Sequence, residues 1–188
     1  QKWQDPDTGL FLGPEVEGAE ITHPRHDWEH VTMHLTAHAL PALDLLGEQP
    51  RYPLYFAHCY LDLPTLSEWL AARNWHDAWL EGNNLLFVGQ FLLHMRDYEG
   101  RSEADQALEH YFAWIDSQVD PQTGLWGTNS HASIPVAVYG AYHQLLVYYY
   151  CRRLVQYPTL IIDRVLDMQH SDGSFVIGGG GGACEDVD

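Results

Sequence analysis

An internal repeat is the feature that most constrains how this chain of 188 residues can fold. Three segments begin with Gln, continue through an Asp-containing turn to a glycine, and place Phe or Trp two residues after that glycine. Gly124 lies 115 residues after Gly9 and 49 residues before Gly173, so the first interval is about twice the second. We therefore predict a repeat of roughly 50 residues with one degenerate copy between the first two segments. The three segments are QDPDTGLFLG (4–13), QVDPQTGLWG (118–127) and QHSDGSFVIG (169–178).

A second comparison extends the repeat over a longer stretch. Residues 30–62 align without a gap on residues 135–167 after a shift of 105 positions. A middle copy fits more loosely, since LLFVGQFLLHM (85–95) resembles VAVYGAYHQLL (136–146). The shift of 105 pairs Val31 with Val136, His38 with His143, Leu40 with Leu145, Tyr52-Pro53 with Tyr157-Pro158, and Leu61-Asp62 with Leu166-Asp167.

Each repeat is predicted to contain two helices, because no alternating β pattern of useful length occurs. Pro53 and Pro158 fall where second helices begin, since proline is tolerated in a first turn but not in a helix interior. Pro41 predicts a kink or an early end in the first helix. The fold class is therefore all-α, built of helical hairpins. The first helices are predicted over 26–47, 81–98 and 133–154, and the second helices over 54–72, 102–118 and 158–169.

Charge and composition argue against several classes of function. Lys and Arg number 9 and Asp and Glu number 26, and the resulting net charge of −17 disfavours nucleic acid and anionic membrane surfaces as partners. No stretch approaches the roughly 20 apolar residues of a transmembrane helix. The three cysteines lack CxxC spacing, so neither a disulfide framework nor a Cys-rich zinc site is expected. The N-terminal QKWQDPDTGL has no initiator Met and no signal sequence, and we expect a cytoplasmic protein whose true beginning is missing.

The segment QHSDGSF (169–175) resembles the Gln…Gly-x-Trp/Phe repeat of squalene cyclases and protein prenyltransferases, in the terpenoid cyclase superfamily. The resemblance implies an α/α toroid, in which inner helices surround a central cavity and Trp126 and Phe175 are structural. A toroid of six hairpins needs roughly 300 residues. We therefore expect residues 1–188 to be a single toroid domain, incomplete at both ends. Its partner would be the missing remainder of the same α6/α6 barrel.

In proteins of this family the active site opens at one end of the inner ring. The loops before the expected inner helices hold HDWEH (26–30), WLEGNN (79–84), TNSH (128–131) and GGGGGACEDVD (178–188). These are polar, aromatic and acidic clusters at equivalent places in the repeat, and they predict a binding site for a small-molecule or oligosaccharide substrate. The substrate-binding candidates are Trp28, His30, Asn83, Asn129, His131, Tyr139 and Tyr142.

The carboxylates of CEDVD, at the end of the sequence, allow two interpretations. Acidic side chains can simply stabilise a helix N-terminus. In a dry cavity, however, crowded carboxylates raise one pKa, and that group can donate a proton near neutral pH. Class II terpene cyclases use an Asp-x-Asp-Asp motif in this way, and Asp186-Val187-Asp188 matches its first three positions. The resemblance implies Asp188 as the proton donor, with Asp186 and Glu185 as neighbouring catalytic candidates.

A metal site is the other possibility near this end of the chain. Protein prenyltransferases bind zinc through an Asp, a Cys and a His, and a bound zinc ion would hold an attacking thiolate. The resemblance offers Cys184, Asp186 and His143 as the three ligands. The cofactor prediction is therefore either that none is required or that a divalent metal, zinc or magnesium, is bound.

Four histidines, His26, His30, His34 and His38, recur at four-residue intervals. Such side chains stack along one helix face, and the line drifts about 40° per step. Adjacent pairs can share a metal, whereas all four cannot. Since His38 is the repeat partner of His143, both are catalytic candidates that line a cavity, or both are hydrogen-bonded core residues. We predict that the stripe lines one wall of the cavity.

Three functions remain open from the sequence. The first is an acid-initiated cyclase or prenyltransferase, whose carbocation aromatic faces such as Tyr139 would stabilise. The second is a carbohydrate-active toroid, either a polysaccharide lyase or a glycosidase acting on unsaturated uronic sugars, in which Asn, His and Tyr act on the sugar. The third is a non-catalytic helical-repeat scaffold that binds peptide or polysaccharide. The aromatic candidates for either enzyme are Trp28, Tyr139, Tyr142 and Tyr148, although packing between helices explains most of the tyrosines better.

Overall fold

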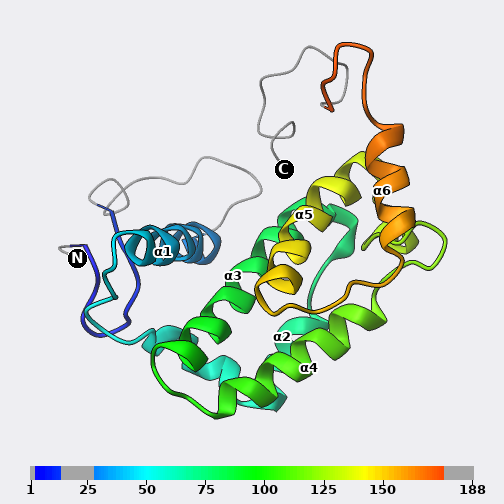
Figure 1. Ribbon diagram of the computed structural model, residues 1–188. Coiled ribbons are helices and arrows are strands. Elements are labelled where there is room, and N and C mark those ends of the chain that lie inside the picture. The colour runs from blue at the N-terminus through cyan, green and yellow to red at the C-terminus, as the bar shows by residue number, and fades with distance from the viewer. Residues whose placement is uncertain (1–2, 14–27, 176–188) are drawn as a thin grey trace. The chain divides into compact units, whose positions relative to one another are not determined.

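A computed structural model describes residues 3–13 and 28–175, and for residues 28 and 29 it describes the backbone alone. This part of the chain is all-α, as predicted, and contains no β-strand. None of its helices is both long enough and apolar enough to cross a membrane. Figure 1 shows the elements in chain order: α1 (Trp28–Leu45), the 3-10 helix η1 (Tyr55–Leu61), α2 (Leu63–Ala71), η2 (Trp75–Asp77), α3 (Ala78–Asp97), α4 (Glu103–Ser117), η3 (Thr128–Ser130), α5 (Ile134–Tyr150) and α6 (Pro158–Asp167).

Five of the six predicted helices are found close to their expected bounds, and the predicted helix over 54–72 is divided in two. Residues Tyr55–Leu61 form the 3-10 helix η1, and α2 follows after Asp62. The backbone of Asp62 is extended, and its carboxylate accepts hydrogen bonds from the amide and the hydroxyl of Thr65. Asp62 therefore caps the N-terminus of α2, and this cap favours a new helix beginning at Leu63 over one continuous helix through residues 54–72.

The prolines behave in two ways. Pro158 is the first residue of α6, as predicted, and Pro53 lies two residues before η1. Pro41 does not end its helix early, because α1 continues through it to Leu45. Pro41 is exposed, whereas its neighbour Leu40 is buried. Packing of the buried face thus outweighs the backbone hydrogen bond that proline removes.

The chain divides into two compact units. Unit 1 comprises Gln1–Ala71 and Phe87–Tyr111, and unit 2 comprises Ala72–Leu86 and Phe112–Asp188, so α3 and α4 contribute residues to both. Each unit has its own apolar core. The core of unit 1 includes Leu54, Leu66, Leu70, Phe87, Phe91, Leu92 and Met95, and that of unit 2 includes Leu85, Phe112, Ile115, Leu125, Trp126, Val147 and Tyr148.

The repeat turns have matching backbone hydrogen bonds. In the first turn the amide of Asp5 donates to the carbonyl of Leu10 at 2.9 Å, and the amide of Gly9 donates to Asp5. In the second turn Asp120 donates to Leu125 at 2.9 Å and Gly124 to Asp120. Isolated β-bridges also match, with Gln4 opposite Phe11 and Val119 opposite Trp126. The third turn is one residue shorter, and its bonds join His170 to Ser174 and Gly173 to His170.

This geometry corrects one detail of the sequence repeat. The residue equivalent to Gln4 in the second turn is Val119, not Gln118. The side chain of Gln118 donates to Ser117, outside the turn. In the third turn Gln169 does correspond to Gln4, because each side-chain amide donates to the carbonyl of the turn glycine, Gly173 or Gly9.

Helices α1 and α5, which the shift of 105 superimposes, end in the same way. In α1 the amide of Glu48 donates to the carbonyl of Leu43, and in α5 the amide of Arg153 donates to Tyr148, both at 2.9 Å. The residues before these donors, Gly47 and Arg152, have φ values of 69° and 52°. This is the Schellman arrangement of a helix C-terminus. Residues that the shift of 105 aligns in sequence therefore also have equivalent backbone structure at these two helix ends.

Candidate functional site

The histidines predicted on α1 differ in their surroundings. His30 is buried, and its ring centroid lies 5.5 Å from that of Phe87. His34 and His38 are exposed, and their Nε2 atoms are 3.0 Å apart. The stripe therefore runs from a buried residue to two solvent-facing residues. His26 and the side chain of Trp28 lie outside the described residues.

The predicted residues of α5 lie close together in unit 2, and two of them, Tyr139 and His143, are buried. His143 is buried, and its Nδ1 lies 3.0 Å from the carbonyl oxygen of Tyr139. Because a carbonyl only accepts, Nδ1 is the donor of this hydrogen bond. The ring of Tyr142 lies 5.3 Å from that of His143, and the hydroxyl of Tyr139 donates to the carbonyl of Phe175. The ring of Trp79 lies 5.5 Å from Tyr139.

The other predicted residues are less closely grouped. The amide of Asn83 donates to the carbonyl of Trp79 one turn earlier in α3. Asn129 lies in η3 and His131 ends it with φ of 68°, and both are exposed. These three residues belong to unit 2 with Tyr139, Tyr142 and His143, whereas Trp28, His30 and His38 belong to unit 1. The remaining candidates, Cys184, Glu185, Asp186 and Asp188, lie outside the described residues.

A buried carboxylate, Glu81, was missed although the loop that contains it was singled out. Its side chain accepts hydrogen bonds from Arg73 at 3.1 Å and from the amide of Asn74 at 3.0 Å. Asn84 also donates to it, at 3.4 Å. The sequence signal that could have indicated this buried pair is a glutamate inside WLEGNN, eight residues after an arginine.

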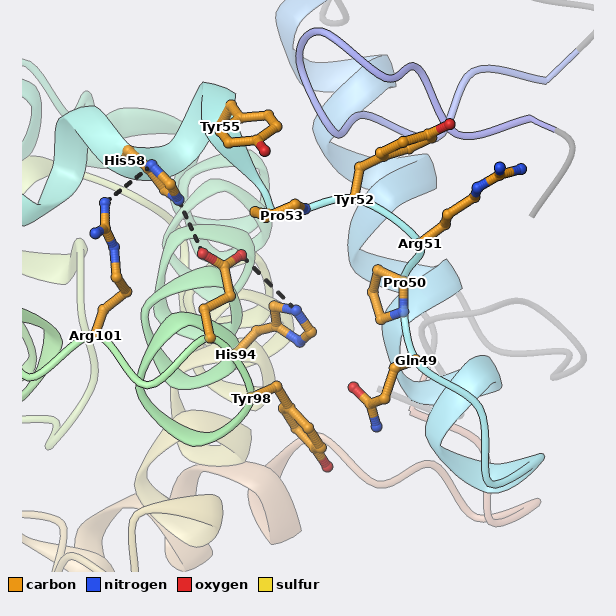
Figure 2. A pocket seen from close by; sticks show the side chains of 11 residues that line it. Gln49, Pro50, Arg51, Tyr52, Pro53, Tyr55, His58, His94, Tyr98 and Arg101 are labelled. Atoms are coloured by element: carbon orange, nitrogen blue, oxygen red, sulfur yellow. Dashed lines mark hydrogen bonds and ion pairs between the residues drawn. The ribbon is translucent and has the colours of Figure 1, made fainter.

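Unit 1 contains a pocket of about 580 Å³ that sequence reasoning did not find. Figure 2 shows that it lies between the segment after α1, the start of η1 and the end of α3. It therefore uses the C-terminal end of α3, whereas the resemblance pointed to the loop before that helix. The lining residues are Gln49, Pro50, Arg51, Tyr52, Pro53, Tyr55, His58, His94, Tyr98, Glu99 and Arg101.

Glu99 organises one side of this pocket. Its Oε1 accepts from the amide of Leu54 at 2.7 Å, and its Oε2 lies 2.8 Å from Nε2 of His58. The Nη2 of Arg101 lies 3.2 Å from Nδ1 of His58. Since a guanidinium only donates, Nδ1 of His58 accepts and its Nε2 donates to Glu99. The carboxylate is therefore engaged on both oxygens. His58 is held between this carboxylate and the guanidinium of Arg101 (Figure 2).

His94 is the buried histidine of the pocket. Burial lowers its pKa, and the nearby carboxylates of Glu99 and Asp97 oppose this shift. Its ring stacks on Tyr98 with centroids 5.1 Å apart, and its Nε2 lies 4.0 Å from Oε1 of Glu99. The hydroxyl of Tyr98 donates to Asp44 at 2.7 Å, which raises the pKa of the tyrosine. Near neutral pH, His94 is uncharged and can accept a proton, while Tyr98 stays protonated.

The lining of the pocket carries more positive than negative charge, although the chain as a whole is acidic. Arg51 and Arg101 supply two guanidinium groups, and Glu99 is the one carboxylate among the lining residues. The guanidinium of Arg51 is exposed and lies 5.4 Å from the ring centroid of Tyr52. The pocket is thus suited to an anion in a protein whose net charge is −17.

Among the described residues, no group of three or more His, Cys, Asp or Glu side chains is arranged to hold a metal ion. The zinc ligands implied by the resemblance include two residues outside this part of the chain, Cys184 and Asp186. No protein-family model, no curated protein and no solved structure matches the chain.

Proposed function

We propose that this protein is carbohydrate-active and that the unit 1 pocket binds a sugar ring bearing a carboxylate, such as a uronate. The observation that carries the proposal is the lining itself. Two arginines and three tyrosines surround a cavity of about 580 Å³ whose one carboxylate, Glu99, is already engaged by Leu54 and His58.

The chemistry of these groups suits an acidic sugar. A guanidinium presents parallel N–H donors that match the two oxygens of a carboxylate. Tyrosine rings combine an apolar face with a polar hydroxyl, as a sugar ring requires of its neighbours. Tyr52, Tyr55 and Tyr98 all line the pocket. A hydrocarbon substrate would gain little from this set.

The reaction class that fits best is elimination by a polysaccharide lyase. In this reaction a base removes the C5 proton next to the uronate carboxylate, while a cation neutralises that carboxylate. The electron pair forms the C4–C5 double bond, the glycosidic C4–O bond breaks, and the leaving oxygen takes up a proton from water. His94 would be the base, because burial keeps it uncharged, and Arg51 would be the neutralising cation. A typical glycosidase needs two carboxylates. The pocket supplies one, and that one is committed to hydrogen bonds.

The test compares a uronate oligosaccharide with its neutral counterpart by titration calorimetry of the full chain. We expect the acidic sugar to bind at least tenfold more tightly, and Arg51→Gln to remove most of that preference. The control Arg164→Gln on α6 removes one positive charge from unit 2, and it should leave the preference for the acidic sugar unchanged. Equal binding of both sugars, or unchanged binding by the Arg51 variant, would overturn the proposal. The lyase step requires ultraviolet absorbance from a new double bond, and His94→Gln should abolish it while binding persists.

A second candidate is the terpenoid cyclase or prenyltransferase type of enzyme, in an α/α toroid. The observation that favours it is the shared hydrogen bonding of the three repeat turns, since the resemblance rests on that repeat. Asp188 and Asp186 would be the proton donor and its neighbour. This proposal requires cyclisation of a polyprenyl substrate by the full chain, and loss of that activity in Asp188→Asn.

A further inference from the structure

We propose that His34 and His38 of α1 form a two-histidine chelating site for a divalent transition-metal ion, with Cu²⁺ as the preferred ion. The two residues lie one helical turn apart and are both exposed to solvent. Their Nε2 atoms face each other at 3.0 Å. This site is separate from the pocket, and it does not depend on the function proposed above.

The two Nε2 atoms are close enough to share one ion, and the preference among ions follows from their affinity for nitrogen. Metal–imidazole bonds are about 2.0–2.1 Å long, so two nitrogens 3.0 Å apart subtend an angle of about 95° at a shared ion. A tetrahedral zinc ion would require the nitrogens to separate to about 3.3 Å. Tetragonal ions prefer neighbouring ligands near a right angle, and Cu²⁺ also binds nitrogen most tightly among the divalent first-row metals.

The helix positions both ligands in advance. The ring of His34 lies edge-on to Phe87 with centroids 5.6 Å apart, and Phe87 is almost fully buried. The side chain of His38 approaches His34 with ring centroids 4.3 Å apart. Thr36 and Ala37, between the two ligands, are buried and attach this turn of α1 to unit 1. The contact with Phe87 restrains His34, and the contact with His34 restrains His38, before an ion binds.

Without metal, one Nε2–H donates to the other Nε2, and this hydrogen bond accounts for the observed contact. Binding of an ion breaks this hydrogen bond, and the donor ring shifts its proton from Nε2 to Nδ1, so that both Nε2 atoms offer a lone pair to the ion. His30 does not complete a three-histidine site in the described residues. Water would therefore occupy the remaining coordination positions.

The test titrates the full, tag-free chain with CuCl₂, NiCl₂ and ZnCl₂, and compares His34→Gln, His38→Gln and the control His76→Gln. His76 is another exposed histidine, in η2 of unit 2. We expect Cu²⁺ to bind most tightly, and either α1 substitution to weaken it at least tenfold. The His76 control should bind as the unaltered chain does. Electron paramagnetic resonance should detect fewer nitrogen ligands in each α1 variant.

Two results would overturn the proposal. If both α1 variants bind Cu²⁺ as tightly as the unaltered chain, the ion is held elsewhere and any binding is adventitious. If Zn²⁺ binds more tightly than Cu²⁺, the assignment of Cu²⁺ as the preferred ion is wrong. Thermal unfolding of each variant verifies that the loss does not come from misfolding, which substitutions of exposed side chains rarely cause.

Discussion

The first and second repeat turns share their backbone hydrogen bonds but are anchored by different side chains. In the first turn the buried amide of Gln4 bonds four backbone groups, at Gly9, Arg51 and Tyr52. In the second turn Val119 occupies that position, and Trp126 anchors the turn instead through its indole N–H to the carbonyl of Ile115. Asp-Pro-x-Thr-Gly therefore specifies the turn, whereas residues that do not repeat attach it to its unit.

The largest difference between the turns should appear when their glycines are changed to alanine. A Cβ on Gly9 would lie 2.0 Å from the carbonyl oxygen of Pro53, and φ there is +80°. At Gly124 the nearest atom would be 3.1 Å away, and at Gly173 no atom lies within 4 Å, although φ is positive at both. Left-handed strain costs about 1–2 kcal/mol and overpacking about 1–3 kcal/mol more, so Gly9→Ala should cost about 2–5 kcal/mol.

Chemical denaturation should therefore rank the variants Gly9→Ala, then Gly124→Ala, then Gly173→Ala, with Gly173→Ala costing about 1–2 kcal/mol. Gly13→Ala is the matched control, because φ is not positive there and no atom lies within 4 Å of its Cβ. Equal costs at Gly9 and Gly124 would show that the close approach to Pro53 does not constrain the first turn.

The next largest effect concerns the anchor. Gln4→Ala leaves the part-buried amides of Arg51 and Tyr52 without their acceptor, and should cost about 3 kcal/mol in unfolding free energy. Gln118→Ala should change the stability by less than about 0.5 kcal/mol, since its side chain bonds Ser117 near the surface. If the two substitutions cost the same, the alignment of Gln118 with Gln4 would be right and the structural register wrong.

The repeat partners His143 and His38 should also differ. His143 is buried and bonds the carbonyl of Tyr139, whereas His38 is exposed. Denaturation of His143→Ala should show a loss of about 2 kcal/mol, from the cavity and the lost hydrogen bond. His38→Ala should remain within about 0.5 kcal/mol of the unaltered chain. A large loss for His38→Ala would mean that α1 buries this face in solution.

Much of the helical framework could be predicted because helix type and proline position are local properties. The bounds of α4 and α6 follow from apolar spacing and from Pro158, and the shift of 105 located two helix ends that share a Schellman arrangement. The split at Asp62 was not visible, since capping by Asp62 competes with continued helix over the same residues. The register of the second turn was missed because Gln118 has the same residue type as Gln4, whereas Val119 has the same place in the backbone hydrogen bonding.

The pocket could not be predicted from local patterns. Its walls come from residues 49–58 and 94–101, and neither segment contains a recognisable motif. The bond between His58 and Glu99 joins residues 41 positions apart, and it arises only when η1 packs beside the end of α3. Of the predicted site, the structure groups Tyr139, Tyr142 and His143, because four-residue spacing on one helix is a local property.

The smallest expected effect distinguishes the turns by pH. The hydroxyl of Thr128 donates to Asp120 at 2.7 Å, whereas the first turn has Gly13 at the equivalent position. This bond, followed by the amide of Gln122, lowers the pKa of Asp120 below its model-peptide value of 3.8. A carboxyl group whose pKa is lower in the folded state stabilises the fold above its unfolded-state pKa, and this contribution disappears as pH falls through the folded-state value.

Thr128→Val should therefore cost less than about 1 kcal/mol at pH 6, since water screens this largely exposed group. The difference in unfolding free energy between this variant and the unaltered chain, measured by denaturation, should decrease as the pH drops below 3.8. A gap that stays constant down to pH 2 would mean that Thr128 stabilises the turn through its 2.8 Å contact with Thr123 instead of through the Asp120 carboxylate.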